Sequence, residues 1–322
     1  MGFGMNGLWL ADRTLSLKSD LPIPDLKPGE AIVKVLRAGV CNTDLELMRG
    51  YYPYSGVLGH EFVGVVTEGP IEWLNKRVVG EINASCGQCD FCKRGIKTHC
   101  IDRTVLGIVN RNGAFAEYLS LPIENLHGVP DEVSTDAATF TEPLAAALEI
   151  LEQISITPNH RVMVIGDGKL GQLVAQAIAT TGCDLLAIGR HSSKLQLLEH
   201  CGIAVGLVGV IQSRSYDIAI ECTGNPDGFA IALEALKPRG ILVMKSTYAG
   251  KLSLDASRIV VDEIQLIGSR CGPFAPALAL LAQQKVQVLP MIQARFPLAD
   301  GLAAFDRASM KGTLKVLLDI NN

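Results

Sequence analysis

The sequence predicts an α/β protein with two domains, a mainly β domain and a second domain built on a doubly wound parallel sheet. Three observations lead to this expectation. About the first 130 residues hold short apolar, β-branched runs between loops rich in Gly, Pro and Asn, with no sustained helical periodicity. After Pro158, short apolar runs alternate with amphipathic helical segments, which is typical of a parallel sheet connected by helices. The length of 322 residues is enough for two separate cores.

Partial alternation of apolar and polar residues predicts the strands of the first domain. They are expected at residues 30–40, 61–68, 76–82 and 115–121. From Ser134 to about Ile156 the apolar residues recur at helical spacing, with Ser134 or Thr135 as the candidate N-cap. We therefore expect a helix where the first domain passes into the second.

The second domain follows a strand–helix alternation up to about residue 270. Its strands are expected at residues 161–165, 185–188, 204–208, 217–221, 240–245 and 264–268, and its helices at residues 169–181, 193–201, 226–236 and 274–284. The tail of the chain holds the last of these helices and a final strand, Thr313–Ile320. These expectations assign residues 1–142 and 271–322 to the mainly β domain and residues 143–270 to the parallel-sheet domain.

Composition and charge narrow the function classes. Charged residues make up 19% of the chain and the formal net charge is −4, so neither nucleic acid nor an anionic membrane is expected as a partner. The N-terminal segment lacks the basic region and apolar run of a signal peptide. No apolar run reaches the length of about 18 residues that a membrane span requires. We therefore expect a soluble, cytoplasmic protein.

Four of the nine cysteines lie close together in the sequence, at Cys86, Cys89, Cys92 and Cys100. An odd number of cysteines without a secretion signal argues against a disulfide framework and for bound metal or buried thiols. An iron–sulfur cluster also uses four cysteines, but this spacing departs from the ferredoxin patterns and lacks their trailing proline. A tetrahedral Cys₄ zinc site leaves no position for a substrate. The sequence therefore predicts a structural zinc ion that holds a loop together.

A second group of metal-ligand side chains is spread over separate segments. Cys41, His60 and Glu61 offer a thiolate, an imidazole and a carboxylate, which are the three kinds of zinc ligand. Catalytic zinc sites use about three protein ligands and keep one position open for water or substrate. Spacing alone does not establish such a site, because a core cysteine and a histidine in a turn would give the same residues.

A glycine-rich turn at residues 166–171 follows the expected strand Arg161–Ile165 and opens the next expected helix. In this context the first glycine makes a tight turn, the second admits a pyrophosphate, and the third lets helix and strand pack closely. The helix N-terminus stabilises the phosphates. The turn is therefore predicted to bind a dinucleotide through Gly166, Gly168, Lys169, Leu170 and Gly171.

The acid that usually ends the second strand of an NAD-binding domain is missing. That strand ends at Gly189 and Arg190, and Asp184 lies at its other end. A carboxylate would repel a 2′-phosphate, whereas Gly189 leaves room and Arg190 offers a planar, bidentate partner. Ser192 and Lys194 add further donors. We therefore expect a preference for NADP, although an Arg190 that stacks on the adenine would leave NAD acceptable.

Further contacts to the dinucleotide are expected where later strands end. The carboxyl ends of parallel strands line the ligand crevice of such a sheet. Cys222 and Thr223 follow one expected strand, and Ser246 follows another. These three residues are therefore candidates for the coenzyme site.

The order of these motifs resembles that of a known family. Cys-x-Thr-Asp at residues 41–44, Gly-His-Glu at 59–61, four cysteines with spacings 2-2-7, Glu-Pro-Leu at 142–144 and Gly-x-Gly-x-x-Gly follow one another along the chain. This combination resembles the zinc-dependent medium-chain alcohol dehydrogenases, from about residue 28 to the end. Glu142 in Glu-Pro-Leu-Ala resembles the sorbitol, threonine and glucose dehydrogenase branches, which use a Glu where liver-type enzymes use Cys.

The resemblance implies a GroES-like catalytic domain, a Rossmann coenzyme domain and two zinc ions per chain. Catalytic zinc would be held by Cys41, His60 and Glu142, with Glu61 as an alternating ligand or an outer carboxylate. Asp44 would orient the His60 ring, and Thr43 would pass on the proton of the alcohol. Ser269 and Arg270 would lie near the nicotinamide, and Lys311 resembles a basic contact of the family to the coenzyme. A homo-oligomer, dimer or tetramer, is expected by analogy.

The function expected from these features is reversible hydride transfer between an alcohol or polyol, or its carbonyl product, and NADP(H). The alternative is a catalytically idle nucleotide-binding protein that keeps the fold as a sensor or partner. Retention of Cys41, Thr43, His60 and Glu142 argues against this alternative. The metal-free enoyl and quinone reductases of the superfamily lack this ligand set.

Overall fold

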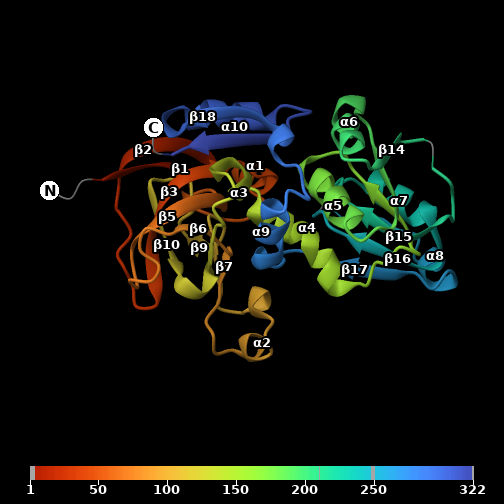
Figure 1. Ribbon diagram of the computed structural model, residues 1–322, viewed down its shortest axis with the longest axis horizontal. Coiled ribbons are helices and arrows are strands. Elements are labelled where there is room, and N and C mark those ends of the chain that lie inside the picture. Colours follow the sequence, from red (N-terminus) through yellow and green to blue (C-terminus); the bar gives the residue numbers. More distant parts are fainter. Residues whose placement is uncertain (1–3, 210, 248–250, 321–322) are drawn as a thin grey trace. The chain divides into compact units, whose positions relative to one another are not determined.

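The computed structural model describes residues 4–209, 211–247 and 251–320. Contacts between Cα atoms divide the chain into two compact units, one formed by Met1–Glu142 with Met291–Asn322 and the other by Pro143–Pro290. The first unit holds mixed and antiparallel sheets and the second a parallel sheet with helices, which confirms the predicted α/β fold class (Figure 1). Within these described ranges, no helix has both the length and the apolar character needed to cross a membrane.

The first unit is organised around a mixed sheet with the strand order β11-β6-β5-β3-β19-β18, in which β10 also pairs with β3. Its strands are β3 (Glu30–Gly39), β5 (Glu61–Glu68), β6 (Arg77–Gly80), β10 (Tyr118–Pro122), β11 (Leu126–Gly128), β18 (Ile292–Pro297) and β19 (Lys315–Asp319). The near-continuous apolar run of β3 is buried, as expected for a strand with neighbours on both sides. The C-terminal strand β19 pairs antiparallel with β3, with Leu317 opposite Gly39. Residues from the end of the chain therefore lie beside the segment that leads to Cys41.

Short strands complete the sheets of this unit. They are β1 (Met5–Ala11), β2 (Thr14–Leu21) and β4 (Gly56–Val57) in one sheet, and β7 (Asn83–Ala84), β8 (Thr104–Leu106) and β9 (Asn110–Arg111) in another. The β1–β2 hairpin is not among the strands predicted from the sequence. Its two-residue turn is Asp12-Arg13, and both residues have positive φ, at 47° and 64°. Such turns are normally marked by glycine, so the usual sequence signal is absent here.

The helices of the first unit are short, and the helix expected over residues 134–156 is divided. The observed helices are α1 (Asn42–Met48), α2 (Asp90–Lys93), α3 (Thr135–Ala138), α4 (Thr141–Gln153), whose later residues belong to the second unit, and α10 (Gly301–Ser309). The Ser134 side chain caps α3 by accepting from the Ala137 amide at 3.2 Å. The Thr139 and Thr141 hydroxyls donate to carbonyls of the preceding turn, at Asp136 and Ala138. Such hydroxyls compete with the helical hydrogen bonds, which is consistent with a break at this point.

The second unit contains a parallel sheet with the strand order β14-β13-β12-β15-β16-β17. Its strands are β12 (Arg161–Ile165), β13 (Asp184–Gly189), β14 (Ala204–Leu207), β15 (Tyr216–Glu221), β16 (Leu236–Met244) and β17 (Gln265–Gly268), and its other helices are α5 (Lys169–Ala179), α6 (Ser192–His200), α7 (Pro226–Ala235), α8 (Ala256–Val261) and α9 (Phe274–Ala282). From β12 the chain adds β13 and β14 toward one edge of the sheet. It then returns to β15, beside β12, and adds β16 and β17 toward the other edge. Parallel sheets of this kind bind ligands where the strand order reverses, outside the carboxyl ends of the strands. That point lies between β12 and β15.

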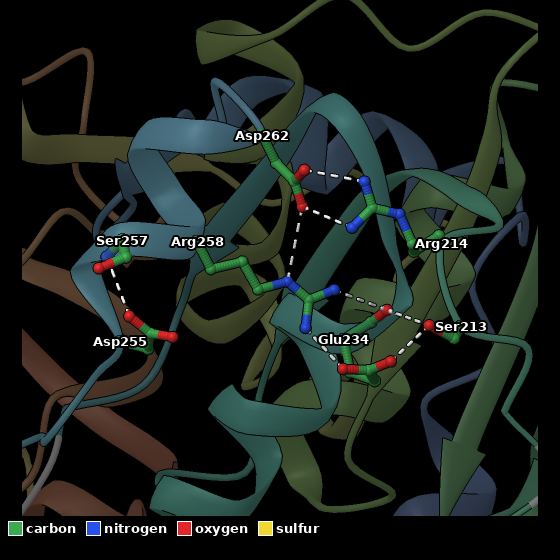
Figure 2. Close-up of polar contacts among 7 residues, drawn as sticks. All are labelled: Ser213, Arg214, Glu234, Asp255, Ser257, Arg258 and Asp262. Carbon is green, nitrogen blue, oxygen red and sulfur yellow. Dashed lines mark hydrogen bonds and ion pairs between the residues drawn. The ribbon is translucent and has the colours of Figure 1, made fainter.

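A network of ion pairs lies at the other end of this sheet, where β15 and β17 begin (Figure 2). The Arg214 guanidinium donates to both carboxylate oxygens of Asp262, at 2.9 and 2.8 Å. Arg258 on α8 pairs with Glu234 at the end of α7 at 2.5 Å, and its Nε lies 3.6 Å from Asp262. The Ser213 hydroxyl also donates to Glu234. The buried Asp262 ends α8, and its hydrogen bonds with Arg214 join this helix to the loop before β15.

Replacement of Asp262 by asparagine is expected to lower the free energy of unfolding by about 1–3 kcal/mol, because it weakens charge-assisted hydrogen bonds at a buried carboxylate. The neighbouring Glu263 is the matched control, since its carboxylate is 71% exposed and pairs with an Arg239 side chain that is 83% exposed. Glu263→Gln should change the unfolding free energy by less than about 0.5 kcal/mol. Urea unfolding of both variants measures the difference. Equal effects would show that the network adds no stability of its own.

Candidate catalytic and coenzyme sites

Three metal-ligand side chains from two separate sequence segments meet in the first unit. The Cys41 thiol, a His60 ring nitrogen and a Glu61 carboxylate oxygen all lie within 4.8 Å of one another. Glu61 is the first residue of β5 and pairs with Gly39 at the end of β3. Cys41 follows β3 as the N-cap of α1. The antiparallel pairing of β3 with β5 therefore brings the ends of two sequence segments to one site.

Gly59 permits the turn that directs His60 into this cluster. Its φ is +98°, a conformation that L side chains rarely adopt, and a Cβ at this position would lie 2.7 Å from the Phe115 ring. Phe115 is itself fully buried. Both the backbone conformation and the local packing therefore require glycine immediately before His60.

Asp44 connects the two ligands that come from different segments. One of its oxygens accepts from the Cys41 amide at 2.8 Å, and the other lies 3.3 Å from Nδ1 of His60. With Nδ1 facing Asp44, Nε2 is the nitrogen left for a metal, which is the usual arrangement of a carboxylate behind a histidine ligand. Burial lowers the pKa of His60, but the charges of Asp44 and Cys41 outweigh it and hold that pKa well above its ordinary value. Metal and proton therefore compete for this ring.

Thr43 lies next to the same cluster. Its hydroxyl oxygen is 3.7 Å from the Cys41 sulfur. Thr43 is only half-buried, unlike Asp44 one residue later in α1. The hydroxyl is therefore close to a ligand atom and still in reach of solvent.

A buried lysine that the sequence analysis did not single out pairs with Glu61. Lys315 and Glu61 form an ion pair in which each side chain is 1% exposed. The Lys315 ammonium also lies 5.3 Å from the centre of the Phe140 ring, a cation–π contact. Burial lowers the pKa of Lys315, but the charges of Glu61, Cys41 and Glu142 outweigh it and raise the pKa above its ordinary value. A Cβ on Gly39 would come within 2.5 Å of the Glu61 carboxylate, so glycine leaves the space that this pair needs.

Two further residues predicted for the site, Glu142 and Lys311, lie on α4 and on the turn before β19. Glu142 lies in the first turn of α4 and is half-buried, and its charge acts on Lys315. Within the described residues, the gathered ligand atoms are those of Cys41, His60 and Glu61, without Glu142. Lys311 is exposed on the turn before β19 and belongs to the first unit. The buried Lys315 lies four residues further along, as the first residue of β19.

The four-cysteine segment forms a second candidate metal centre. One sulfur each from Cys86, Cys89, Cys92 and Cys100 lies within 4.8 Å of the other three. Cys89 is the N-cap of α2, and the Cys92 amide, followed by smaller contributions, lowers its pKa to about 6. The Gln88 and Cys89 amides lower the pKa of Cys86. Thiolates held in this way are the ligands that zinc binds, so these residues fit a Cys₄ site. In Figure 1 this segment extends away from the sheets of its own unit.

The second unit has a pocket of about 230 Å³ at the carboxyl ends of β12, β13 and β15. The predicted coenzyme residues that line it are Gly166, Gly168, Gly189, Arg190, Cys222 and Thr223. The lining residues that the sequence analysis missed include Asp167, His191, Val208, Asn225, Gly228 and Ile231. A Cβ on Gly171 would lie 1.9 Å from the Gly166 carbonyl oxygen, so the third glycine of the turn permits close packing of α5. The pocket and the turn together fit the diphosphate and adenosine parts of a dinucleotide.

Eight predicted coenzyme residues of this unit lie outside the lining of that pocket. They are Lys169, Leu170, Gly171, Ser192, Lys194, Ser246, Ser269 and Arg270. Lys169 and Leu170 belong to the first turn of α5, and Ser192 begins α6. Buried Lys245 donates to the Ser269 hydroxyl at 3.0 Å and to the Arg270 carbonyl at 2.6 Å. This lysine therefore holds the chain after β17 in a defined position.

The space above Gly189 is occupied, contrary to the expectation that this glycine leaves room. A Cβ on Gly189 would lie 2.4 Å from a carboxylate oxygen of Asp167. That oxygen accepts from the amides of Arg190 and His191, both at 2.7 Å. Burial raises the pKa of Asp167, but these hydrogen bonds and the charge of Lys194 outweigh it, so the pKa lies below its ordinary value. The glycine-rich turn therefore supplies a carboxylate at the strand end where the sequence lacks one.

Comparison with known proteins agrees with this arrangement. Residues 27–131 match the family described as alcohol dehydrogenase GroES-like domain, and residues 170–283 match the family described as zinc-binding dehydrogenase. The chain is 30% identical to the erythritol/L-threitol dehydrogenase of Mycolicibacterium smegmatis, over 93% of each protein. It is 27% identical to the D-arabitol-phosphate dehydrogenase of Enterococcus avium, over 94% of this chain and 93% of that protein.

Solved structures give the same result. The crystal structure of a putative zinc-binding dehydrogenase from Sinorhizobium meliloti bound to NADP superposes with a TM-score of 0.90 at 25% identity, covering 99% of this chain and all of that one. The two family matches cover most of the chain, and the Mycolicibacterium smegmatis relative aligns with 93% of it. The chain therefore belongs to the zinc-dependent medium-chain alcohol dehydrogenase superfamily and is an NAD(P)-dependent, zinc-dependent enzyme of that kind.

Proposed function

We propose that this enzyme interconverts a polyol or related alcohol and its carbonyl product, with NADP(H) as the preferred coenzyme and NAD(H) accepted. The observation that carries the proposal is the cluster of the Cys41 thiol with the buried His60 imidazole and Glu61 carboxylate. The polyol class is supported by relatives named for erythritol, threitol and arabitol phosphate. The preference for NADP is supported by Arg190, which lines the coenzyme pocket and whose side chain is 59% exposed.

The residues of the first unit would hold two zinc ions. Cys41 and His60, with Glu142 or Glu61 as the carboxylate, would hold a catalytic ion, and the four cysteines Cys86, Cys89, Cys92 and Cys100 would hold a structural one. A catalytic zinc ion lowers the pKa of a bound water from 15.7 to about 7, and it would act similarly on an alcohol hydroxyl. Asp44, whose carboxylate lies 3.3 Å from Nδ1 of His60, would orient this ring toward the metal. The Thr43 hydroxyl, 3.7 Å from the Cys41 sulfur, would relay the proton of the alcohol, accepting it at its oxygen while giving up its own hydrogen toward solvent.

Each unit would thus have its own task. Residues 1–142 and the C-terminal part of the chain form the catalytic zinc-binding domain, and the intervening parallel-sheet domain binds the dinucleotide. Hydride transfer belongs to the nicotinamide chemistry of the coenzyme. The protein contributes binding, relative position and exclusion of water. The enzyme is proposed to act as a homo-oligomer, and sedimentation at the mass of a single chain would contradict this.

The proposal is tested by metal analysis combined with a substrate panel. We expect two zinc ions per chain, turnover of at least one polyol or ketose, loss of turnover with a chelator and recovery with zinc. Each substrate should be assayed in both directions with NADP and NAD. Coenzyme binding without any redox change across the panel would indicate an idle nucleotide-binding protein instead. Turnover that survives complete removal of zinc would place the enzyme with the metal-free reductases.

A further inference from the structure

The carboxylate of Asp167 occupies a site of anion-binding character inside the coenzyme pocket. Its oxygens accept from the Arg190 and His191 amides, face Nδ1 of His191 at 3.0 and 3.1 Å, and lie 3.6 Å from the Lys194 ammonium. These four donors are defined here as the basic corner. His191 is also the N-cap of α6. Backbone amides at a helix start, together with cationic side chains, are the groups that proteins use to bind phosphate.

The basic corner lies at the end of β13, where a coenzyme ribose is gripped in folds of this kind. Asp167 is 7% exposed and Lys194 is 12% exposed, so solvent screens their interaction only in part. The protein's own carboxylate therefore already accepts the hydrogen bonds of these amides and offsets the charge of Lys194. A 2′-phosphate at this corner would meet a like charge fixed by two short hydrogen bonds.

Arg190 acts in the opposite direction. Its side chain is 59% exposed and, among the described residues, pairs with the 73% exposed Asp227 at 3.4 Å, so it can turn toward a phosphate at modest cost. The pocket thus contains one group that favours a 2′-phosphate and one that disfavours it. The balance between them decides how strongly the enzyme discriminates between the two coenzymes.

We propose that Asp167 is a specificity-determining residue, whose carboxylate occupies the basic corner in place of a 2′-phosphate and so limits the preference for NADP over NAD. The inference rests on the proposed dehydrogenase function, because it concerns the coenzyme of that reaction. It assigns a role to the second residue of the glycine-rich turn, whereas the usual determinant is the residue that ends β13. Here that residue is Gly189, and Asp167 fills the space above it.

The test uses two probes that differ only in the 2′-phosphate, adenosine 2′,5′-bisphosphate and 5′-AMP, with binding to the zinc-loaded enzyme measured by calorimetry. Asp167→Asn keeps an oxygen for the Arg190 and His191 amides and removes the charge. We expect the ratio of the two affinities to rise about tenfold in favour of the bisphosphate, and the NADP-to-NAD ratio of kcat/KM to rise in the same direction. Asp167→Ser, which also opens the space above Gly189, should change the ratio in the same direction. It serves as the second variant should the asparagine disturb the turn.

The matched control is Glu199→Gln, an exposed position on α6 that gives the same change of charge away from the pocket. Its affinity ratio should stay within twofold of the wild type. An unchanged or lower ratio in folded Asp167→Asn and Asp167→Ser proteins would overturn the inference. A wild-type enzyme that prefers 5′-AMP would contradict the proposed NADP preference, while a raised ratio in the variants would still support the role of Asp167. Failure of the wild type to bind either probe would overturn both.

Discussion

Replacement of Lys315 by methionine is expected to lower the free energy of unfolding by about 3–5 kcal/mol, because it removes the buried cation that pairs with the Glu61 carboxylate. Lys315 and Glu61 are each 1% exposed, so water cannot take over the lost interaction. The same ammonium faces the charges of Cys41 and Glu142. Its loss concentrates negative charge at the candidate zinc site. Chemical denaturation of the metal-loaded protein, followed by circular dichroism, measures the effect.

Lys311→Met is the matched control for this prediction. It makes the same chemical change four residues earlier, at an exposed lysine on the turn before β19. The change in unfolding free energy there should be within about 0.5 kcal/mol, as for most surface substitutions. The double variant Lys315→Met with Glu61→Gln should recover part of the loss, since the two residues form one pair. Similar unfolding energies for the two single lysine variants would refute the importance of the buried pair.

The parallel-sheet unit was the most predictable part of the fold. Its inner strands β12, β13 and β15 are mostly buried and read as apolar runs, and each of these three is followed by a helix, so local sequence reports this part of the topology directly. The β1–β2 hairpin was missed, because an Asp12-Arg13 turn with positive φ carries no glycine signal. The predicted helix over residues 134–156 was found as α3 and α4, separated where two threonine hydroxyls bond back to the main chain. Such breaks depend on side-chain hydrogen bonds that periodicity does not record.

The ligands of the candidate zinc site could be proposed from residue type, whereas their supporting groups could not. Lys315 and Glu61 are 254 positions apart, and no local pattern links them. The available signal was a lysine directly before the apolar run at residues 316–318 of the final strand, since a lysine is rarely tolerated in a core without a partner. Asp167 was read only as the variable position of a glycine motif. Its role depends on the close approach of two loops, which the motif does not encode.

Replacement of His60 by alanine is expected to reduce kcat/KM about a thousandfold or more, since a catalytic metal contributes several kcal/mol to the transition state. The variant should retain one zinc ion per chain, held by the four cysteines, and should keep its fold. Cys89→Ser should have the opposite profile, with loss of the other ion and a lower unfolding temperature but part of the turnover retained. Metal analysis, steady-state kinetics and thermal unfolding of both variants separate the two centres.

The control for the histidine variant is His200→Ala. His200 is exposed at the end of α6, where its ring faces the Gln196 carbonyl of the same helix. It should leave zinc content and turnover unchanged. His60 lies 3.3 Å from Asp44 and is 3% exposed, so its removal also takes the neighbouring ring away from one oxygen of this buried carboxylate, while the other keeps its hydrogen bond from the Cys41 amide. Asp44→Asn therefore provides a second comparison, with retained zinc ligands and an expected loss of metal affinity of about 10–100-fold. If His60→Ala kept both zinc ions and full turnover, the metal-binding role of the cluster at Cys41, His60 and Glu61 would have to be abandoned.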